Sequence, residues 1–213
     1  MDQVGDVIVA GYFSGETDFG GTTFNVSDPE VFIAKLDGAN GALKWVVRGS
    51  GPGNQDVTDV VVDPSGNIHV SGVTQNNVLF GTQNYAMVGT TDSFVVKLSS
   101  SGSVLGITGY GIANQAVSLT KMAVDSYGDL YVGGSFEGTM AKNGWSITAN
   151  KGGADLFFIK EGTTSNNQWA NIGVTNAADG LQGMEVTSKG EVIFTSFFIS
   201  SSFTGGTKGA TPT

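Results

Sequence analysis

Residues 62–72 read VDPSGNIHVSG, and this stretch decides the fold because the chain repeats it. Three counterparts are recognisable: residues 1–11 (MDQVGDVIVAG), 124–134 (VDSYGDLYVGG) and 186–196 (VTSKGEVIFTS). The glycine that closes the short turn in each copy recurs at intervals of 61, 62 and 62 residues, at Gly5, Gly66, Gly128 and Gly190. Self-similarity at a fixed period indicates stacked units, none of which can bury its apolar side alone.

The second copy extends into four expected strands, which we call a (58–62), b (68–73), c (93–98) and d (104–108). Short polar turns join a to b and c to d, and a long polar connection, residues 74–91, joins b to c. Pro and Gly in the a–b turn preset the backbone angles that a tight turn requires. The pattern predicts a small antiparallel meander.

The other copies follow the same plan. The third has strands at 119–124, 130–136, 156–160 and 169–174. The first has only b, c and d (7–13, 31–36, 43–47), and the fourth only a and b (184–186, 192–198). This makes thirteen expected strands in one repeat domain over residues 1–213. Its repeats are 1–56 (partial), 57–116, 117–180 and 181–213 (partial).

Strand c carries the tightest internal match. Residues 30–35, 92–97 and 155–160 share acid-x-Phe-x-x-Lys. Phe and Lys point to opposite faces because side chains alternate along a strand. The nearly continuous apolar character predicts burial on both faces, with the acid and the lysine capping the two ends of the strand.

These motifs resemble the bacterial β-propeller repeat called SBBP. The resemblance rests on residues 62–72 and 124–134, on the c–d segments that end in Trp45 and Trp169, and on FGG-like elements at 18–21, 80–81 and 203–206. Two departures are Thr187, which replaces the Asp of the turn, and Gly106, which stands where other repeats have Trp. The resemblance implies an all-β propeller-type array of four-stranded antiparallel blades, about three blades plus partial terminal repeats. It also implies a large secreted or surface protein, a group whose roles vary.

Propellers ordinarily close with four to eight blades. Strand b occurs at both ends of this chain, so simple closure of a four-bladed ring leaves one copy redundant. Three arrangements stay open: a fragment of a longer polypeptide, a ring completed by another chain, and an open array stacked into an assembly.

The amino-acid composition limits the classes of partner that the chain can bind. The net charge is −9, which makes nucleic acid and anionic membrane surfaces unfavourable partners. There is no cysteine, hence no disulfide or thiolate metal site, and no apolar run has the length of a membrane span. Residues 1–4 lack signal-peptide features, and we expect an extracellular or cell-surface location for the mature chain.

Catalytic and metal motifs are sparse. His69 is the only histidine and occupies a strand-b position where other repeats carry Ile8, Tyr131 and Ile193, which favours a packing role over catalysis. The turns that begin at Asp63 and Asp125 lack EF-hand spacing, so we predict no metal and no cofactor, with calcium at these turns as the weaker alternative. No sialidase-type box is present.

Binding candidates come from two places. Asp59, Lys121 and Glu185 lie in strand a, the strand that usually lines a propeller's central channel. Tyr85 and Trp145 lie in the long b–c connections, where they could form a recognition surface or anchor the loop.

The sequence therefore favours a non-catalytic extracellular or cell-surface repeat module for adhesion, for binding a protein or glycan, or for extracellular assembly. Two alternatives are kept. One is a propeller polysaccharide hydrolase or lyase that uses carboxylates of strand a. The other is a structural subunit that associates with itself through incomplete terminal blades.

Overall fold

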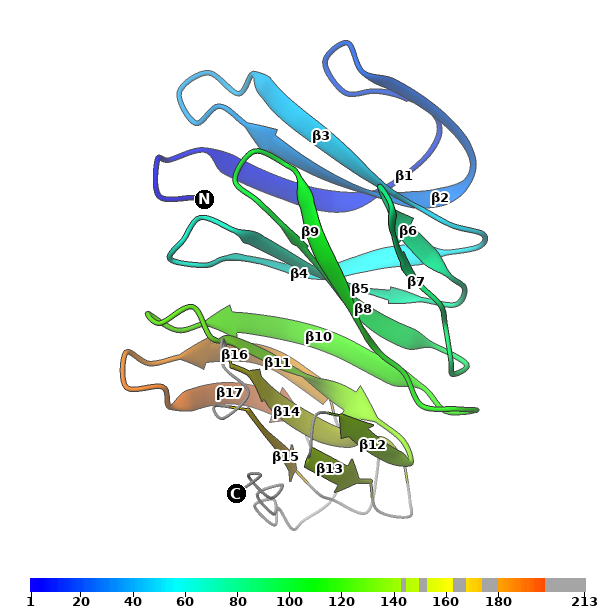
Figure 1. Ribbon diagram of the computed structural model, residues 1–213, viewed down its shortest axis with the longest axis vertical. Coiled ribbons are helices and arrows are strands. Elements are labelled where there is room, and N and C mark those ends of the chain that lie inside the picture. The colour runs from blue at the N-terminus through cyan, green and yellow to red at the C-terminus, as the bar shows by residue number, and fades with distance from the viewer. Residues whose placement is uncertain (143–144, 150–152, 163–167, 174–179, 198–213) are drawn as a thin grey trace. The chain divides into compact units, whose positions relative to one another are not determined.

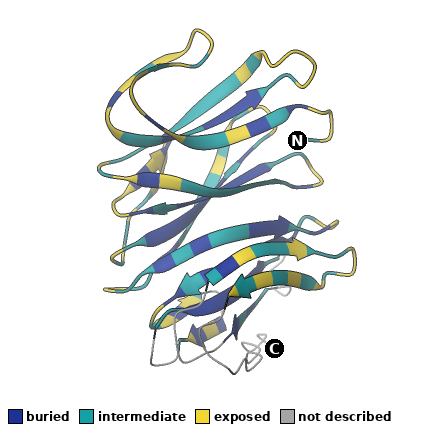
Figure 2. Cartoon of the chain, turned by 180° about the vertical axis from the view of Figure 1, so that it is seen from behind, coloured by how far each residue is buried: buried dark blue, intermediate teal, exposed yellow. Residues whose placement is uncertain are grey.

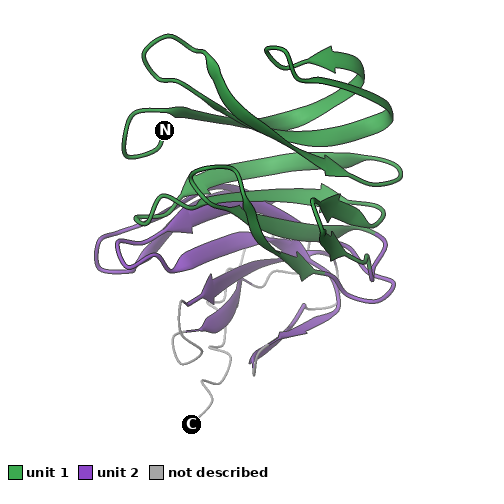
Figure 3. Ribbon diagram, turned by 45° about the horizontal axis from the view of Figure 1, so that its top comes forward, with its two compact units in different colours: residues 1–87, 91–110 green, residues 88–90, 111–213 purple. Residues whose placement is uncertain are grey.

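The computed structural model describes residues 1–142, 145–149, 153–162, 168–173 and 180–197. These residues form seventeen β-strands, with no helix among them, as the all-β prediction requires (Figure 1). Accordingly, no described segment is a helix long and apolar enough to cross a membrane. The chain divides into two compact units, residues 1–87 with 91–110 (unit 1) and residues 88–90 with 111–213 (unit 2) (Figure 3).

Unit 1 holds the first nine strands. They are β1 (Val7–Asp18), β2 (Thr23–Leu36), β3 (Leu43–Ser50), β4 (Gln55–Val62), β5 (Ile68–Thr74), β6 (Val78–Phe80), β7 (Gln83–Tyr85), β8 (Asp92–Leu98) and β9 (Val104–Tyr110). They pair into a sheet of order β1-β2-β3-β6-β7 and a second sheet of order β4-β5-β8-β9. The second sheet is the a–b–c–d meander expected for the second repeat, with every pair antiparallel.

The long polar b–c connection of the second repeat contains two strands that the sequence analysis did not predict. Residues within 74–91 form the hairpin β6–β7, and β6 pairs with β3 of the preceding repeat through Gly49 opposite Phe80. A side chain at Gly49 would collide with the Phe80 ring, since an added Cβ would lie 2.3 Å from it. This b–c connection therefore joins the sheet of the preceding repeat, a non-local pairing that local sequence patterns do not reveal.

Unit 2 holds the remaining strands. They are β10 (Val117–Val124), β11 (Leu130–Phe136), β12 (Thr139–Lys142), β13 (Trp145–Thr148), β14 (Asp155–Glu161), β15 (Trp169–Gly173), β16 (Gly180–Val186) and β17 (Val192–Phe197). They form a four-stranded sheet β10-β11-β14-β15 and the pairs β12-β13 and β16-β17. The β12–β13 hairpin is again an unpredicted element of a b–c connection. The FGG-like element at 203–206 and the predicted ends of strands b and d at 198 and 174 lie outside the described residues.

The two faces of each sheet differ in what covers them. We define the front face of a repeat as the face on which strand b carries Val9 or its counterpart. The back face is the opposite one. In unit 1 the back of the first repeat contributes Ile8, Val31 and Ile33 to the core. The front of the second repeat contributes Ile68, Val70, Phe94, Val96 and Leu98, and β6 adds Val78 and Phe80. The core of unit 1 is thus a front-to-back stack. β5 is buried along nearly its whole length, whereas only Ile8 and Phe13 of β1 are buried (Figure 2).

Unit 2 repeats this packing. Leu156 and Phe158 on the back of the third repeat pack against Leu181, Met184 and Phe194 of the fourth. The rings of Phe158 and Phe194 have centroids 4.5 Å apart. Neighbouring repeats therefore stack front to back within both units, at equivalent strand positions.

A β-bulge recurs in strand a. The register shifts between Val57 and Asp59 in β4, between Leu119 and Lys121 in β10, and between Leu181 and Gly183 in β16. A bulge bends and twists its strand and re-aims the side chains that follow. Its recurrence establishes that these three strands occupy equivalent places in their repeats.

Candidate functional site

The first residue of each a–b turn closes the turn with its own side chain. One carboxylate oxygen of Asp63 accepts hydrogen bonds from the backbone N–H groups of Ser65 and Asn67, both at 2.9 Å. The same pair of bonds is made by Asp2, by Asp125 and, through a hydroxyl oxygen, by Thr187. Thr187 therefore performs the local task of the aspartate it replaces, which explains why the fourth repeat keeps its turn.

The strand-c lysine reaches this turn across the sheet. Lys160 lies 2.8 Å from Asp129 and 3.7 Å from Asp125. In the second repeat Lys97 lies 3.6 Å from Asp63. The expected capping role is thus more specific than the sequence indicated: the lysine ties strand c to the a–b turn of its own repeat by an ion pair.

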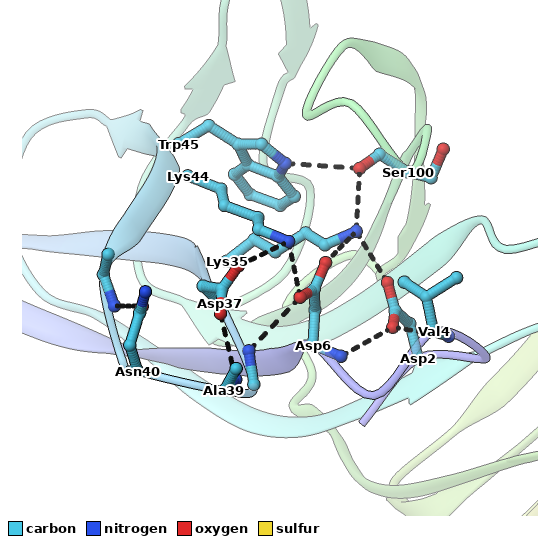
Figure 4. A network of polar contacts seen from close by, with 12 residues as sticks. Asp2, Val4, Asp6, Lys35, Asp37, Ala39, Asn40, Lys44, Trp45 and Ser100 are labelled. Atoms are coloured by element: carbon cyan, nitrogen blue, oxygen red, sulfur yellow. Dashed lines mark hydrogen bonds and ion pairs between the residues drawn. The ribbon is translucent and has the colours of Figure 1, made fainter.

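The first repeat enlarges this contact into a network (Figure 4). Lys35 lies 2.6 Å from Asp2 and 3.2 Å from Asp6. Lys44 lies 2.6 Å from Asp6 and 3.2 Å from Asp37. Three carboxylates thus alternate with two ammonium groups over the strand ends of β1, β2 and β3.

The network also joins two repeats. The backbone carbonyl of Ser100, in the c–d turn of the second repeat, accepts hydrogen bonds from the Lys35 ammonium at 3.4 Å and the Trp45 indole N–H at 3.2 Å (Figure 4). Gly102 of the same turn lies under the Trp45 ring, where an added Cβ would approach to 2.9 Å. Lys35 and Trp45 therefore fasten the first repeat to the second.

The charges of the network are fixed. The hydrogen bond from Lys35 holds the pKa of Asp2 below its ordinary value, and the bond from Lys44 does the same for the pKa of Asp6. The hydrogen bond to Asp2 raises the pKa of Lys35. A hollow of about 440 Å³ adjoins Asp6, Asp37 and Lys44. Groups held in their charged states by each other are poorly suited to proton transfer near neutral pH, and this arrangement serves cohesion.

The described residues contain no cluster of three or more His, Cys, Asp or Glu side chains arranged to hold a metal ion. Calcium at the a–b turns was the weaker alternative. The carboxylate oxygens of these turns accept hydrogen bonds from backbone N–H groups and form ion pairs with lysines.

His69 is buried beside the turn of the second repeat. Its Nε2 lies 3.3 Å from the second carboxylate oxygen of Asp63. At the equivalent position the Tyr131 hydroxyl donates to Asp125 at 3.1 Å. Burial lowers the pKa of His69, an effect that Asp63 opposes and the charge of Lys97 reinforces. The histidine therefore occupies a packing position, as its place in the repeat indicated.

The strand-a candidates are distributed over both units. Asp59 on β4 is half-buried, and its carboxylate accepts a hydrogen bond from the N–H of Val60 at 2.9 Å. Lys121 on β10 follows the same bulge as Asp59, so these two positions are equivalent. Glu185 on β16 is exposed and lies two positions further along, opposite Ile193. A channel lined by all three stays a prediction.

The loop aromatics anchor their hairpins. The Tyr85 hydroxyl donates to Asp92, the acid of strand c, at 2.6 Å, and burial together with this bond raises the pKa of Tyr85. Its ring covers Gly109, where an added Cβ would lie 1.7 Å away. Trp145 is buried and begins β13 opposite Lys142. A recognition role for either residue stays a prediction.

The front face of the first repeat is apolar and only partly covered. Val9 on β1 and Ala34 on β2 are cross-strand partners on this face. Val9 is 37% exposed, whereas its counterpart Val70 is 0% exposed. The β1–β2 hairpin tip folds over this face, where Phe19 packs on Phe32 with ring centroids 4.9 Å apart, and a hollow of about 290 Å³ lies beneath it.

Residues 44–80 match the SBBP family, described as a beta-propeller repeat. The matched segment starts in β3, contains β4 and β5 and ends in β6, so the SBBP match spans the a–b pair and the strand that pairs with the preceding repeat. The resemblance inferred from the motifs is thereby confirmed. No curated protein matches the chain.

Sequence reasoning missed two features of the repeats. One is the partner of the strand-c lysine, for which the repeated co-occurrence of a turn Asp and a strand-c Lys was an available signal. The other is the partly covered front face of the first repeat. No sequence signal distinguishes it, because Val9, Phe32 and Leu36 are the same kinds of residue as their buried counterparts.

Proposed function

We propose that the chain is a non-catalytic, extracellular or cell-surface module of SBBP repeats that acts in binding and assembly. Each four-stranded meander is a propeller-type blade in this proposal. The observation that carries it is the repeated front-to-back stack, in which the back of one repeat takes the front of the next in both units. Repeats that stack on their neighbours build extended arrays with large binding surfaces.

The polar chemistry supports the same role. The turn carboxylates, the strand-c lysines and His69 are engaged in holding strands together. The net charge of −9 favours a solvated exterior and disfavours polyanionic partners. Both features belong to a cohesive module whose exposed surfaces, rather than a reaction centre, carry its role.

The test has two arms. Protease added to intact source cells should remove the protein, as expected for a surface location, while a cytoplasmic marker stays intact. Purified protein incubated with a panel of polysaccharides should release no new reducing ends. Release that disappears in Asp59→Asn or Glu185→Gln, and persists in the surface control Lys189→Gln, would establish the hydrolase alternative and overturn the proposal.

A further inference from the structure

The stacking contact joins equivalent strand positions in both units. In unit 1, Val70 on the front of the second repeat shares the core with Ile8 and Ile33 on the back of the first. In unit 2, Phe194, the counterpart of Val70, lies against Phe158, the counterpart of Ile33. The same strand positions thus meet in both units, so the partner of a front face is the back face of another repeat.

In unit 1, the front face of the first repeat lacks such cover. Val9 of the first repeat has 37% of its surface exposed where Val70 has none. Its neighbours on this face, Phe32 and Leu36, are half-buried, whereas the counterparts Phe94 and Leu98 are fully buried. The hollow of about 290 Å³ beneath the β1–β2 hairpin lies over these residues.

In unit 2, the back face of the described part of the fourth repeat is exposed at one position that is buried in the first repeat. On β17, Ile193 is 59% exposed, although its counterpart Ile8 is buried in the core of unit 1. Phe197 is 51% exposed, as is its counterpart Tyr12 at 62%. Thr195, which lies between Ile193 and Phe197, is the counterpart of Gly133. Leu181 and Met184 pack over Gly133. Glu185, opposite Ile193, adds one charge to this face, which makes a contact here weaker than the internal ones.

Building on the proposed function, we propose that the back of β17 in one copy of the chain binds the front of β1 and β2 in a second copy. The contact continues, between molecules, the packing that already joins neighbouring repeats within each unit. Its two surfaces are different, so copies associate head to tail, and such a contact propagates into rings or filaments.

Complementary variants test this geometry. In sedimentation or light scattering over a concentration series, the unmodified chain should self-associate. Val9→Lys and Ile193→Lys should each weaken association by about tenfold or more, because each places an ammonium group in an apolar contact. Leu105→Lys, on a 52% exposed residue of β9 outside both faces, should leave it unchanged. Val9→Lys mixed with Ile193→Lys should form a one-to-one complex that stops at two copies, since each variant keeps one intact face.

Cross-linking supplies a second measurement that does not depend on disrupting the surface. The chain has no cysteine, so single replacements are unambiguous. Under oxidation, Val9→Cys mixed with Ile193→Cys should give a disulfide-linked pair faster than either variant alone, and faster than Val9→Cys mixed with Leu105→Cys.

A chain that is monomeric throughout the series, or cross-linking with no preference for the Val9–Ile193 pair, overturns the head-to-tail contact. Either result leaves the proposed surface location and lack of turnover standing, since those are measured on cells and polysaccharides. Hydrolysis of a polysaccharide would overturn the proposed function without affecting the association data.

Discussion

The ammonium nitrogen of Lys160 on β14 lies 2.8 Å from a carboxylate oxygen of Asp129, in the turn between β10 and β11. The same nitrogen lies 5.1 Å from the centre of the Tyr131 ring. Burial alone would lower the pKa of Lys160, but the bonds to Asp129 and Tyr131 outweigh it and raise that pKa. The lysine side chain is 11% exposed, so this ion pair is shielded from water.

We expect Lys160→Met to destabilise the third repeat by about 2 kcal/mol, because it leaves the buried carboxylates without their cation. Lys97→Met is the matched control: that lysine is 42% exposed and lies 3.6 Å from Asp63, so its loss should cost less than about 1 kcal/mol. Native-state hydrogen exchange of the strand-b amides in each repeat measures both effects. Equal losses of stability in the two variants would show that the shorter, more buried ion pair stabilises its repeat no more than the exposed one.

Gly109→Ala should dislodge the β6–β7 hairpin. A methyl group there would lie 1.7 Å from the Tyr85 ring, so the ring must leave its place beside Asp92. The expected loss of stability is about 1–3 kcal/mol. Gly106→Ala on the same strand meets nothing within 4 Å and should change stability by no more than about 0.5 kcal/mol. Limited proteolysis of the b–c connection and denaturant unfolding report the difference; similar behaviour of the two variants would contradict it.

His69 predicts a pH dependence of stability. Because its pKa is lowered in the folded protein, the unfolded chain binds the proton more tightly. Stability should therefore fall as the pH drops below the ordinary histidine value of 6.5. Asp63 contributes separately. Burial raises its pKa, but hydrogen bonds outweigh burial and lower that pKa. The stability that Asp63 contributes is therefore lost only as the pH falls below 3.8.

His69→Tyr, which copies the third repeat, should remove the loss between neutral pH and the carboxylate range. Tyr131 makes the equivalent bond to Asp125 without titrating in this window. Unfolding free energies of both proteins at several pH values above the carboxylate range measure the effect. If the unfolding free energy of the variant has the same pH dependence, groups other than His69 cause it. Those groups would not be histidines, because the chain has no second one.

The stacking of Phe158 on Phe194 should appear as coupling between two substitutions. Phe158→Ala should cost about 3 kcal/mol as a core truncation. Combined with Phe194→Ala, it should show a coupling of about 1 kcal/mol, typical of an aromatic pair in contact. Phe197→Ala, on the opposite face of β17, is the control partner and should show none. Additive losses from Phe158→Ala and Phe194→Ala would contradict the front-to-back stack.

Much of the fold was predictable because it is encoded locally. The recurrence of the turn around Gly66 and of the apolar run after it predicts strands a and b. Strand b of the third repeat, predicted at 130–136, is observed at Leu130–Phe136. Side-chain alternation and turn chemistry act over a few residues, so they are legible in a single sequence.

The candidate site was less predictable. The sequence marked Tyr85 and Trp145 as loop aromatics and Asp59, Lys121 and Glu185 as charged strand-a positions. It could not show that Tyr85 bonds Asp92 or that Asp59 and Lys121 follow the same bulge. Those facts depend on register, and a shift of one residue turns every side chain to the other face.

The sequence by itself determined the repeat period, the all-β class and the turns, since each follows from residues close together in the chain. Only the tertiary structure decided that β6 pairs with β3 of the preceding repeat and that Lys35 reaches Ser100 of the following one. It also decided that Val9 is exposed while Val70 is buried. Identical residue types acquire different environments because burial depends on which other repeat lies against them, and that neighbour is distant in sequence.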